Sequence, residues 1–263
     1  MVVGAETRAV VTGASRGIGR ALSEALAARG ATLGLMARGA GGVEALAAEL
    51  PGEHVALAAD VADRAEVAAA IERFLEAAGG IDLLVANAGI AHYAPFVETD
   101  VELAEEMVRV NVLGAIYTLK AGLPPMLDRG RGHVVIVSSG AGLRPFPWAA
   151  VYGSTKAAGR ALGEALRHEL SGTGVGLTTV YPGEVRTDLH AHERERMPDW
   201  YRSEDAIDAE AVAAAIVDAV EGDRRSAFVP GIVRALGING LAPRLTDRIL
   251  RTLRGPTAAP RRD

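Results

Sequence analysis

Tyr152 and Lys156 stand four residues apart in the stretch Tyr-Gly-Ser-Thr-Lys at 152–156. In a helix this spacing puts both side chains on one face, with Cβ atoms about 5–6 Å apart. Lowering the pKa of a phenol from about 10 towards neutrality requires roughly 4 kcal/mol. A cation about 4 Å away supplies on the order of 4 kcal/mol in a partly buried site. The spacing therefore predicts an acid–base pair in which Lys156 alone can lower the pKa of Tyr152.

A pair of serines supports a chemical role for this stretch. Ser138 and Ser139 follow the apolar run 134–137, which is typical of a buried strand. A hydroxyl at a strand end can bond a substrate oxygen while Tyr152 gives or takes its proton. A chance surface pair of Tyr and Lys is disfavoured, because the chain has only two lysines. The serine hydroxyl, Tyr152 and Lys156 are thus predicted to form one site.

A glycine-rich turn lies near the N-terminus. The short apolar strand 8–12 runs into residues 13–19, which carry three glycines, and apolar residues then recur at helical spacing from about Gly17. Free backbone N–H groups at such a helix start, with the helix dipole, form a cradle for a phosphate group. A plain tight turn is the alternative. The placement between strand and helix favours the phosphate cradle.

Apolar strands alternate with amphipathic helices along the chain. This alternation predicts a parallel sheet with helices on both faces. The expected fold is a doubly wound, Rossmann-type, three-layer α/β fold with about seven strands. The strands after the first are expected at 32–37, 54–58, 81–86, a run ending at 138, and 175–181, and the helices at 43–50, 62–78, 101–127 and 152–170.

Composition limits the classes of function. The chain of 263 residues is 49% hydrophobic, without a composition break inside 6–230, which predicts one domain over 1–263 with its core at about 6–230. A net charge of −5 excludes a general nucleic-acid binder. With no cysteine, disulfides and thiolate chemistry are excluded. Residues 1–8 lack a leader pattern and no apolar run reaches about 18 residues, so a soluble cytoplasmic protein is expected.

Residues that break the strand pattern fall where the strands end. In parallel sheets of this kind, ligands lie beyond the carboxyl ends of the strands. These ends are predicted to gather at one edge of the sheet. The residues concerned are Gly13 to Gly19, Arg38, Asp60, Asn87-Ala88-Gly89, Ser139 and Pro182-Gly183.

Together these motifs resemble the short-chain dehydrogenase/reductase family over residues 6–190. The matching positions are Thr12-Gly13-x-x-x-Gly17-x-Gly19, Asp60, Asn87-Ala88-Gly89, Asn111, Ser139, Tyr152-x-x-x-Lys156, Pro182-Gly183 and Thr187. Two departures stand out. Ala86 occupies a position where a further Asn is common, and residues beyond 190 follow no family motif, which leaves the substrate open.

The resemblance implies roles for individual residues. Tyr152 would donate or accept the proton, and Ser139 would hold the substrate oxygen. Lys156 would bind the nicotinamide ribose and lower the pKa of Tyr152, while Asn111 would hold a water linking Lys156 to solvent. The implied coenzyme site comprises Gly13, Ser15, Arg16, Gly17, Ile18, Gly19, Arg38, Asp60, Val61, Asn87, Ala88, Gly89, Tyr152, Lys156, Pro182, Gly183, Val185 and Thr187.

The residues at the end of the second strand favour NADP(H) over NAD(H). Enzymes of this fold that prefer NAD place an acid there to bond the ribose 2′-hydroxyl, whereas a 2′-phosphate is bound by arginine. The acid would stand at Ala37, which is followed by Arg38, and Arg16 lies in the glycine loop. Two guanidinium groups can therefore converge on one phosphate. Solvated surface arginines are the alternative.

The expected activity is an NADP(H)-dependent carbonyl reductase or alcohol dehydrogenase acting on a mainly apolar or amphipathic small molecule. A non-catalytic NADP-binding regulator and an NAD-dependent alcohol dehydrogenase are the alternatives. The positions expected to line the substrate pocket are His92, Tyr93, 143–148, Glu184 and 189–201. Within the last range, His190, His192, Glu193 and Glu195 are interpreted as a charged lid and not as a metal site.

The C-terminal region is predicted to be an amphipathic helical extension over about 231–254, followed by a disordered tail at 255–263. Its apolar stripe is expected to pack on this subunit or a neighbour, and contact with an anionic membrane is the less favoured use. The stripe consists of Leu241, Leu245, Ile249, Leu250 and Leu253, opposite Arg244, Arg248, Arg251 and Arg254. The family resemblance implies a homodimer or homotetramer.

Overall fold

A seven-stranded parallel sheet forms the centre of the computed structural model, which describes residues 1–187, 206–240, 242–244 and 247–248. Its strand order is β3-β2-β1-β4-β5-β6-β7, so the chain winds outwards from β1 in one direction and from β4 in the other. The predicted doubly wound α/β fold is confirmed. The strands are β1 (Arg8–Thr12), β2 (Thr32–Ala37), β3 (Val55–Ala58), β4 (Leu83–Ala86), β5 (Gly132–Val137), β6 (Val175–Pro182) and β7 (Ser226–Val229).

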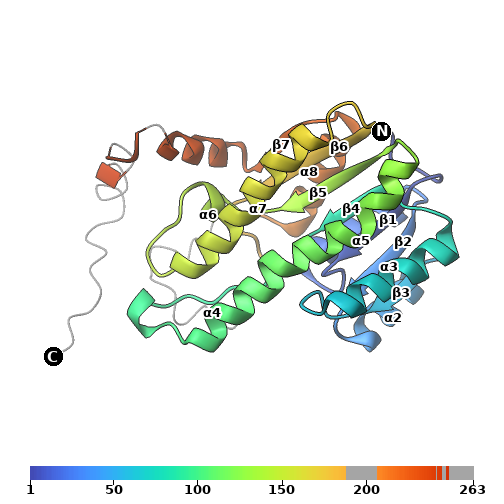
Figure 1. The fold of residues 1–263 in the computed structure, drawn as a ribbon, viewed down its shortest axis with the longest axis horizontal. Coiled ribbons are helices and arrows are strands. Elements are labelled where there is room, and N and C mark those ends of the chain that lie inside the picture. The colour runs from blue at the N-terminus through green and yellow to red at the C-terminus, as the bar shows by residue number, and fades with distance from the viewer. Residues whose placement is uncertain (188–205, 241, 245–246, 249–263) are drawn as a thin grey trace.

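Helices cover both faces of this sheet, and Figure 1 shows α3, α5 and α7 in front of it. Residues of α1, α2 and α8 share one apolar core, and residues of α3, α5 and α7 contribute to a second. The long helices are α1 (Gly17–Ala27), α2 (Ala40–Glu49), α3 (Arg64–Ala78), α4 (Val101–Val108), α5 (Gly114–Asp128), α7 (Ala150–Glu169) and α8 (Ala209–Glu221). The shorter ones are η1 (Phe96–Glu98), η2 (Arg109–Leu113), α6 (Gly140–Leu143) and η5 (Gly231–Gly240).

The alternation of side chains along β1 explains the two cores. Ala9 and Val11 belong to the core on one face, whereas Val10 belongs to the core on the other. Successive side chains of a strand point to opposite faces, so a strand covered on both sides is apolar throughout. All three residues are fully buried.

The single helix predicted over 101–127 is divided into three parts. It begins as α4, passes through a π-helical turn, η2, and continues as α5. Asn111 lies within the π turn and is buried there. A π turn adds one residue to a helical turn and is frequent at functional sites. Asn111 is thereby offset from the regular helical path.

Only part of the helical extension predicted over 231–254 lies in the described chain. Residues 231–240 form the 3₁₀ helix η5, in which Val233 is the buried residue. The predicted leucine stripe, Arg251, Arg254 and the tail at 255–263 lie outside the described residues. Within the described part of the chain, no helix has both the length and the apolar character needed to span a membrane.

Candidate active site

The carboxyl ends of β1 and β4 are joined through Thr12. Its hydroxyl donates to the Val85 carbonyl at 3.1 Å and accepts the backbone N–H groups of Asn87 at 3.0 Å and Ala88 at 3.1 Å. The Asn87 amide donates to the Thr12 carbonyl at 2.8 Å. A buried hydroxyl with all its bonding capacity used holds two loops in a fixed relation. The glycine loop and the 87–89 turn are therefore one rigid unit.

Two glycines give the β1–α1 loop its shape. Gly13 has a φ of +67°, a conformation that side chains with a Cβ rarely adopt. A Cβ built on Gly19 would lie 2.1 Å from the Gly13 carbonyl oxygen, so a larger residue cannot fit there. Within the described chain, no side chain caps the N-terminus of α1. Its first N–H groups are thus available to an anion.

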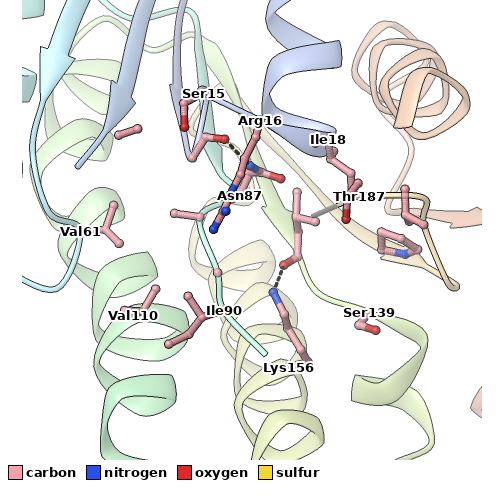
Figure 2. Close-up of a pocket in the computed structure, with 18 of the residues that line it drawn as sticks. Ser15, Arg16, Ile18, Val61, Asn87, Ile90, Val110, Ser139, Lys156 and Thr187 are labelled. Carbon is pink, nitrogen blue, oxygen red and sulfur yellow. Dashed lines mark hydrogen bonds between the residues drawn. The ribbon is translucent and has the colours of Figure 1, made fainter. Parts of the chain in front are cut away.

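A cavity of about 360 Å³ lies beyond these strand ends. Figure 2 shows Ser15, Arg16 and Ile18 at one end of it, and Ser139 and Lys156 at the other. The predicted residues that line the cavity are Gly13, Ser15, Arg16, Gly17, Ile18, Arg38, Asp60, Val61, Asn87, Ala88, Gly89, Ser139, Tyr152, Lys156, Pro182, Gly183, Val185 and Thr187. Gly19 and Asn111 belong to the supporting layer, because Gly19 packs on Gly13 and Asn111 is buried behind Gly89.

Tyr152 and Lys156 lie in the first turns of α7, and both are buried. The Lys156 ammonium donates to the Val137 carbonyl at 3.2 Å and lies 5.9 Å from the centroid of the Tyr152 ring. The helix thus begins two residues before the predicted start, and it brings the two side chains together as the spacing predicted. The cation lies over the ring face.

The expectation that Lys156 alone lowers the pKa of Tyr152 is not supported. Burial raises the pKa of the Tyr152 phenol to about 12, and the group that lowers it is Ser139, through a side-chain hydrogen bond. Burial also lowers the pKa of Lys156 to about 8. Removing both groups from water disfavours both charged forms, and the sequence spacing did not show this desolvation.

Asn111 connects the π turn to the catalytic helix. Its side-chain oxygen accepts the Ile90 N–H at 2.8 Å, and its amide donates to the Ile90 carbonyl at 2.9 Å and to the Thr155 hydroxyl at 3.0 Å. Thr155 in turn donates to the Tyr152 carbonyl at 2.7 Å. A Cβ on Gly89 would lie 3.2 Å from both the Asn111 oxygen and the Lys156 nitrogen, so both side chains pack against Gly89. The predicted water-holding role of Asn111 remains a proposal.

Ser139 caps the short helix α6. Its hydroxyl oxygen accepts the Ala141 N–H at 3.1 Å, which is the usual bond of an N-cap serine. The neighbouring Ser138 has a structural partner, because its hydroxyl donates to the Lys156 carbonyl at 2.7 Å. Ser139 can therefore accept from α6 and still donate its own proton into the cavity.

Arg16 and Arg38 are both exposed at the cavity edge. The guanidinium of Arg38 lies 3.9 Å from the carboxylate of Glu106 on α4. Sequence reasoning did not identify Glu106, because it lies 68 residues further along the chain and is brought near only by the fold. The site thus offers two positive groups, one of which has an acidic neighbour.

The residues expected to line the substrate pocket lie only partly within the described chain. Tyr93 does not line the described cavity. It is buried behind Tyr152, with ring centroids 5.6 Å apart, and stacks on Phe146 at 5.9 Å. The range 189–201, including the His and Glu cluster at 190–195, lies outside the described residues. Among the residues that the structure does describe, no three His, Cys, Asp or Glu side chains gather in a way that could hold a metal.

Several residues that line the cavity were not predicted from the sequence. Ala59, Ile90, Val110 and Val137 line the same cavity as the predicted residues and as Ser138 of the predicted serine pair. Ala59, Ile90 and Val110 are each next to a predicted position, so adjacency to Asp60, Gly89 or Asn111 was the available signal, and Val137 directly precedes the serine pair. Their plain side chains carried no chemical pattern that could have identified them.

Comparison with known proteins identifies similar sequences and structures. A family model described as short chain dehydrogenase matches residues 7–198. The chain is 41% identical over 184 residues to a glycine betaine reductase of Emericella nidulans. That match covers 69% of this chain but 14% of the fungal protein. The fungal protein is therefore much longer than the matched segment.

Two solved structures show how far the fold agrees. A short chain dehydrogenase/reductase from Burkholderia phymatum, in complex with NAD, has a TM-score of 0.81 at 27% identity, with both chains covered fully. An alcohol dehydrogenase from Thermococcus sibiricus, complexed with 5-hydroxy-NADP, has a TM-score of 0.74 at 31% identity. The match covers 84% of this chain and 94% of that one. The similar structures include one complex with each type of coenzyme.

Proposed function

The chain belongs to the short chain dehydrogenase family, and on that premise we propose that it is an NADP(H)-dependent oxidoreductase. Its reaction interconverts a carbonyl and a secondary alcohol on a mainly apolar or amphipathic small molecule. The observation that carries this proposal is the shared cavity, which is lined by the glycine loop at one end and by Ser139 and Lys156 at the other, with Tyr152 also in its lining.

The chain's residues fit a dinucleotide. Gly13 and Gly19 shape a loop that brings backbone N–H groups to a phosphate, and a Cβ at Gly19 would close that loop. Arg16 and Arg38 supply the positive charge that a 2′-phosphate needs, and Ala37 supplies no acid to oppose it. Lys156 supplies donors for ribose hydroxyls. A nicotinamide coenzyme bound there would supply the hydride.

Tyr152 acts as the general acid in the reducing direction. Because its pKa is about 12, the phenol is protonated at neutral pH and can give a proton to the substrate oxygen as negative charge develops there. Ser139 donates a hydrogen bond to the same oxygen and orients the carbonyl. Reduction therefore uses the protonation state that Tyr152 already has, whereas oxidation would first require a phenolate.

Lys156 stabilises the charge that remains after proton transfer. With a pKa of about 8, its ammonium is largely charged at neutral pH. It lies over the Tyr152 ring, where a cation favours the phenolate. Asn111 bonds both Thr155 in this turn of α7 and the Ile90 carbonyl. These bonds hold the turn that carries Tyr152 and Lys156 in place.

The test is to replace Tyr152 with Phe. We expect turnover with NADPH and a reducible carbonyl to fall by roughly 10²–10⁴-fold, the usual worth of a placed general acid. The affinity for NADPH, measured by fluorescence titration, should change little, because the ring and its packing remain. A variant that keeps more than a tenth of wild-type turnover would show that Tyr152 is not the acid.

A screen of carbonyl compounds with NADPH, followed by the loss of coenzyme absorbance, identifies the substrate class. Wild-type protein that binds NADPH tightly but reduces no compound would favour the non-catalytic regulator. Turnover with NADH exceeding that with NADPH would favour the NAD-dependent alternative.

A further inference from the structure

The part of the chain after β7 contacts the loop that carries Ser139. The family model ends at residue 198, so this contact is outside the shared pattern. Here the C-terminal clasp denotes Val233 and Leu236 of η5 together with Asp247. It packs against α6, the four-residue helix whose N-cap is Ser139. The inference below rests on the proposed function, because it concerns how Ser139 is held for the reaction.

Val233 is the centre of this contact. A Cβ built on Gly140 would lie 3.3 Å from a methyl carbon of Val233, and one built on Gly183 would lie 3.5 Å from the other. Gly140 directly follows Ser139, and Gly183 directly follows Pro182 at the end of β6. Val233 is 6% exposed, and its β-branched side chain has little rotameric freedom. It therefore acts as a fixed spacer between the two loops.

The clasp also contacts the far end of α6. Arg144, the residue after this helix, forms an ion pair with Asp247, while its backbone N–H bonds the Gly140 carbonyl at 3.0 Å. Leu236 adds a second apolar contact at Gly140, 3.3 Å from the Cβ position. A single turn of helix has little stability of its own. Contacts at both of its ends are thus what fix its orientation.

The orientation of α6 determines what the Ser139 hydroxyl can do. That hydroxyl accepts the Ala141 N–H, and its one proton is then free to be donated towards Tyr152 or a substrate oxygen. If α6 rotates or frays, the N-cap bond is lost and the donor direction is no longer set. We propose that Val233 and Asp247 are positioning residues, and that the C-terminal clasp holds Ser139 in its catalytic orientation through α6.

The decisive variant is Val233→Ala, with Ile232→Ala as the matched control. Ile232 precedes Val233 in η5 but is 76% exposed. We expect Val233→Ala to lower kcat by about tenfold, part of the 10²–10³-fold worth of an oxyanion donor. Ile232→Ala should leave kcat unchanged. Val233→Ile, which keeps a β-branched side chain, should retain most of the wild-type kcat. Equal effects of Val233→Ala and Ile232→Ala would overturn the proposal.

A double-mutant cycle separates positioning from general damage. In a Ser139→Ala background, Val233→Ala should cost nothing further, because the group through which it acts is gone. A full tenfold additional loss would contradict the proposal. Asp247→Asn should give a smaller fall in kcat, since its ion pair with Arg144 is partly exposed and such pairs are weak.

Hydrogen exchange provides a readout that needs no turnover. The Ala141 amide, bonded to Ser139, should exchange faster in Val233→Ala than in wild type and in Ile232→Ala. Unchanged exchange at Ala141 would overturn the inference even if the enzyme is active. An inactive wild-type protein that still shows the exchange difference would instead place the failure in the proposed function.

Discussion

Ala37 ends β2 and Arg38 follows it at the cavity edge, where a single charge can decide which coenzyme binds. Replacing Ala37 with Asp and Arg38 with Asn installs an acceptor for a ribose 2′-hydroxyl and removes a phosphate partner. A charge-assisted hydrogen bond contributes about 1.5–3 kcal/mol, so the ratio of kcat/KM for NADPH over NADH should fall at least tenfold. Steady-state kinetics with both coenzymes measure it, and a wild-type preference for NADH would refute the assignment.

His133 makes stability depend on pH. It lies at the start of β5 with 2% exposure, its Nε2 is 2.8 Å from the Thr178 hydroxyl, and burial lowers its pKa to about 4. The unfolded chain gains this proton near pH 6.5, so stability should fall as the pH drops from about 6.5 to about 4.

Between pH 7 and pH 5 the His133 contribution to the loss should be about 2 kcal/mol in the free energy of unfolding. Urea titrations at both pH values measure it. His133→Gln should be less acid-sensitive than wild type by about that amount, whereas the exposed His168→Gln should match wild type. The same acid sensitivity in His133→Gln would mean that another group is responsible.

Residue spacing predicted which side chains meet, but not the environment in which they meet. The four-residue step from Tyr152 to Lys156 depends only on helix geometry, so their proximity followed from the sequence. Their pKa values depend on how much water the completed fold removes, and on Ser139, which reaches Tyr152 across the sheet edge. Desolvation is a property of the packed molecule.

At the scale of elements, the π turn η2 had no visible signal. Apolar residues continue at near-helical spacing through 101–127, so one uninterrupted helix was the simplest expectation. In the structure Asn111 bonds Ile90 and Thr155, and these tertiary bonds accompany the irregular turn. The parallel sheet with helices on both faces, in contrast, followed from the alternation of apolar strands and amphipathic helices.

Asp82 directly precedes β4, joins three elements and should be a determinant of stability. It accepts the Arg8 side chain at 2.7 Å and 3.0 Å, the Arg8 backbone N–H at 3.0 Å, and Arg129 at 2.7 Å. Although burial raises the pKa of Asp82, hydrogen bonds from Arg8 and Arg129 bring it below its usual range.

Asp82→Asn should lower the free energy of unfolding by about 2 kcal/mol, because it weakens charge-assisted bonds and leaves two arginines without their carboxylate. Chemical denaturation measures this, and kcat should be unchanged. The control is Arg131→Gln, since Arg131 is 68% exposed and 3.8 Å from Asp82, and its loss should cost under about 0.5 kcal/mol. Similar losses in both variants would contradict a specific role for Asp82.

At the scale of the whole molecule, α7 offers a surface for self-association. Ala161 and Ala165 are exposed along its outer side, and such small residues allow helices to approach closely. We predict a homodimer or a two-fold tetramer, the usual closed symmetries of homo-oligomers. Light scattering should then give a mass of at least about twice 27.3 kDa.

The matched variants for this prediction are Ala161→Glu and Ala48→Glu. Both alanines are exposed, one on α7 and one on α2. A buried charge at a subunit contact is costly, so Ala161→Glu should shift the population towards monomer while Ala48→Glu should not. A wild-type monomer at micromolar concentration would reject the prediction.

One end of β5 contributes to stability and the other leads to the candidate active site. This separation affects which substitutions the protein can tolerate. His133 stands at one end and Ser139 just beyond the other, six residues or roughly 20 Å along the strand. Substitutions so far apart, without shared partners, have additive effects on free energy. Stabilising replacements near His133 can therefore offset destabilising ones around the cavity without altering its chemistry. A library that diversifies the cavity should consequently retain more folded members when it is built on a variant stabilised at the far end.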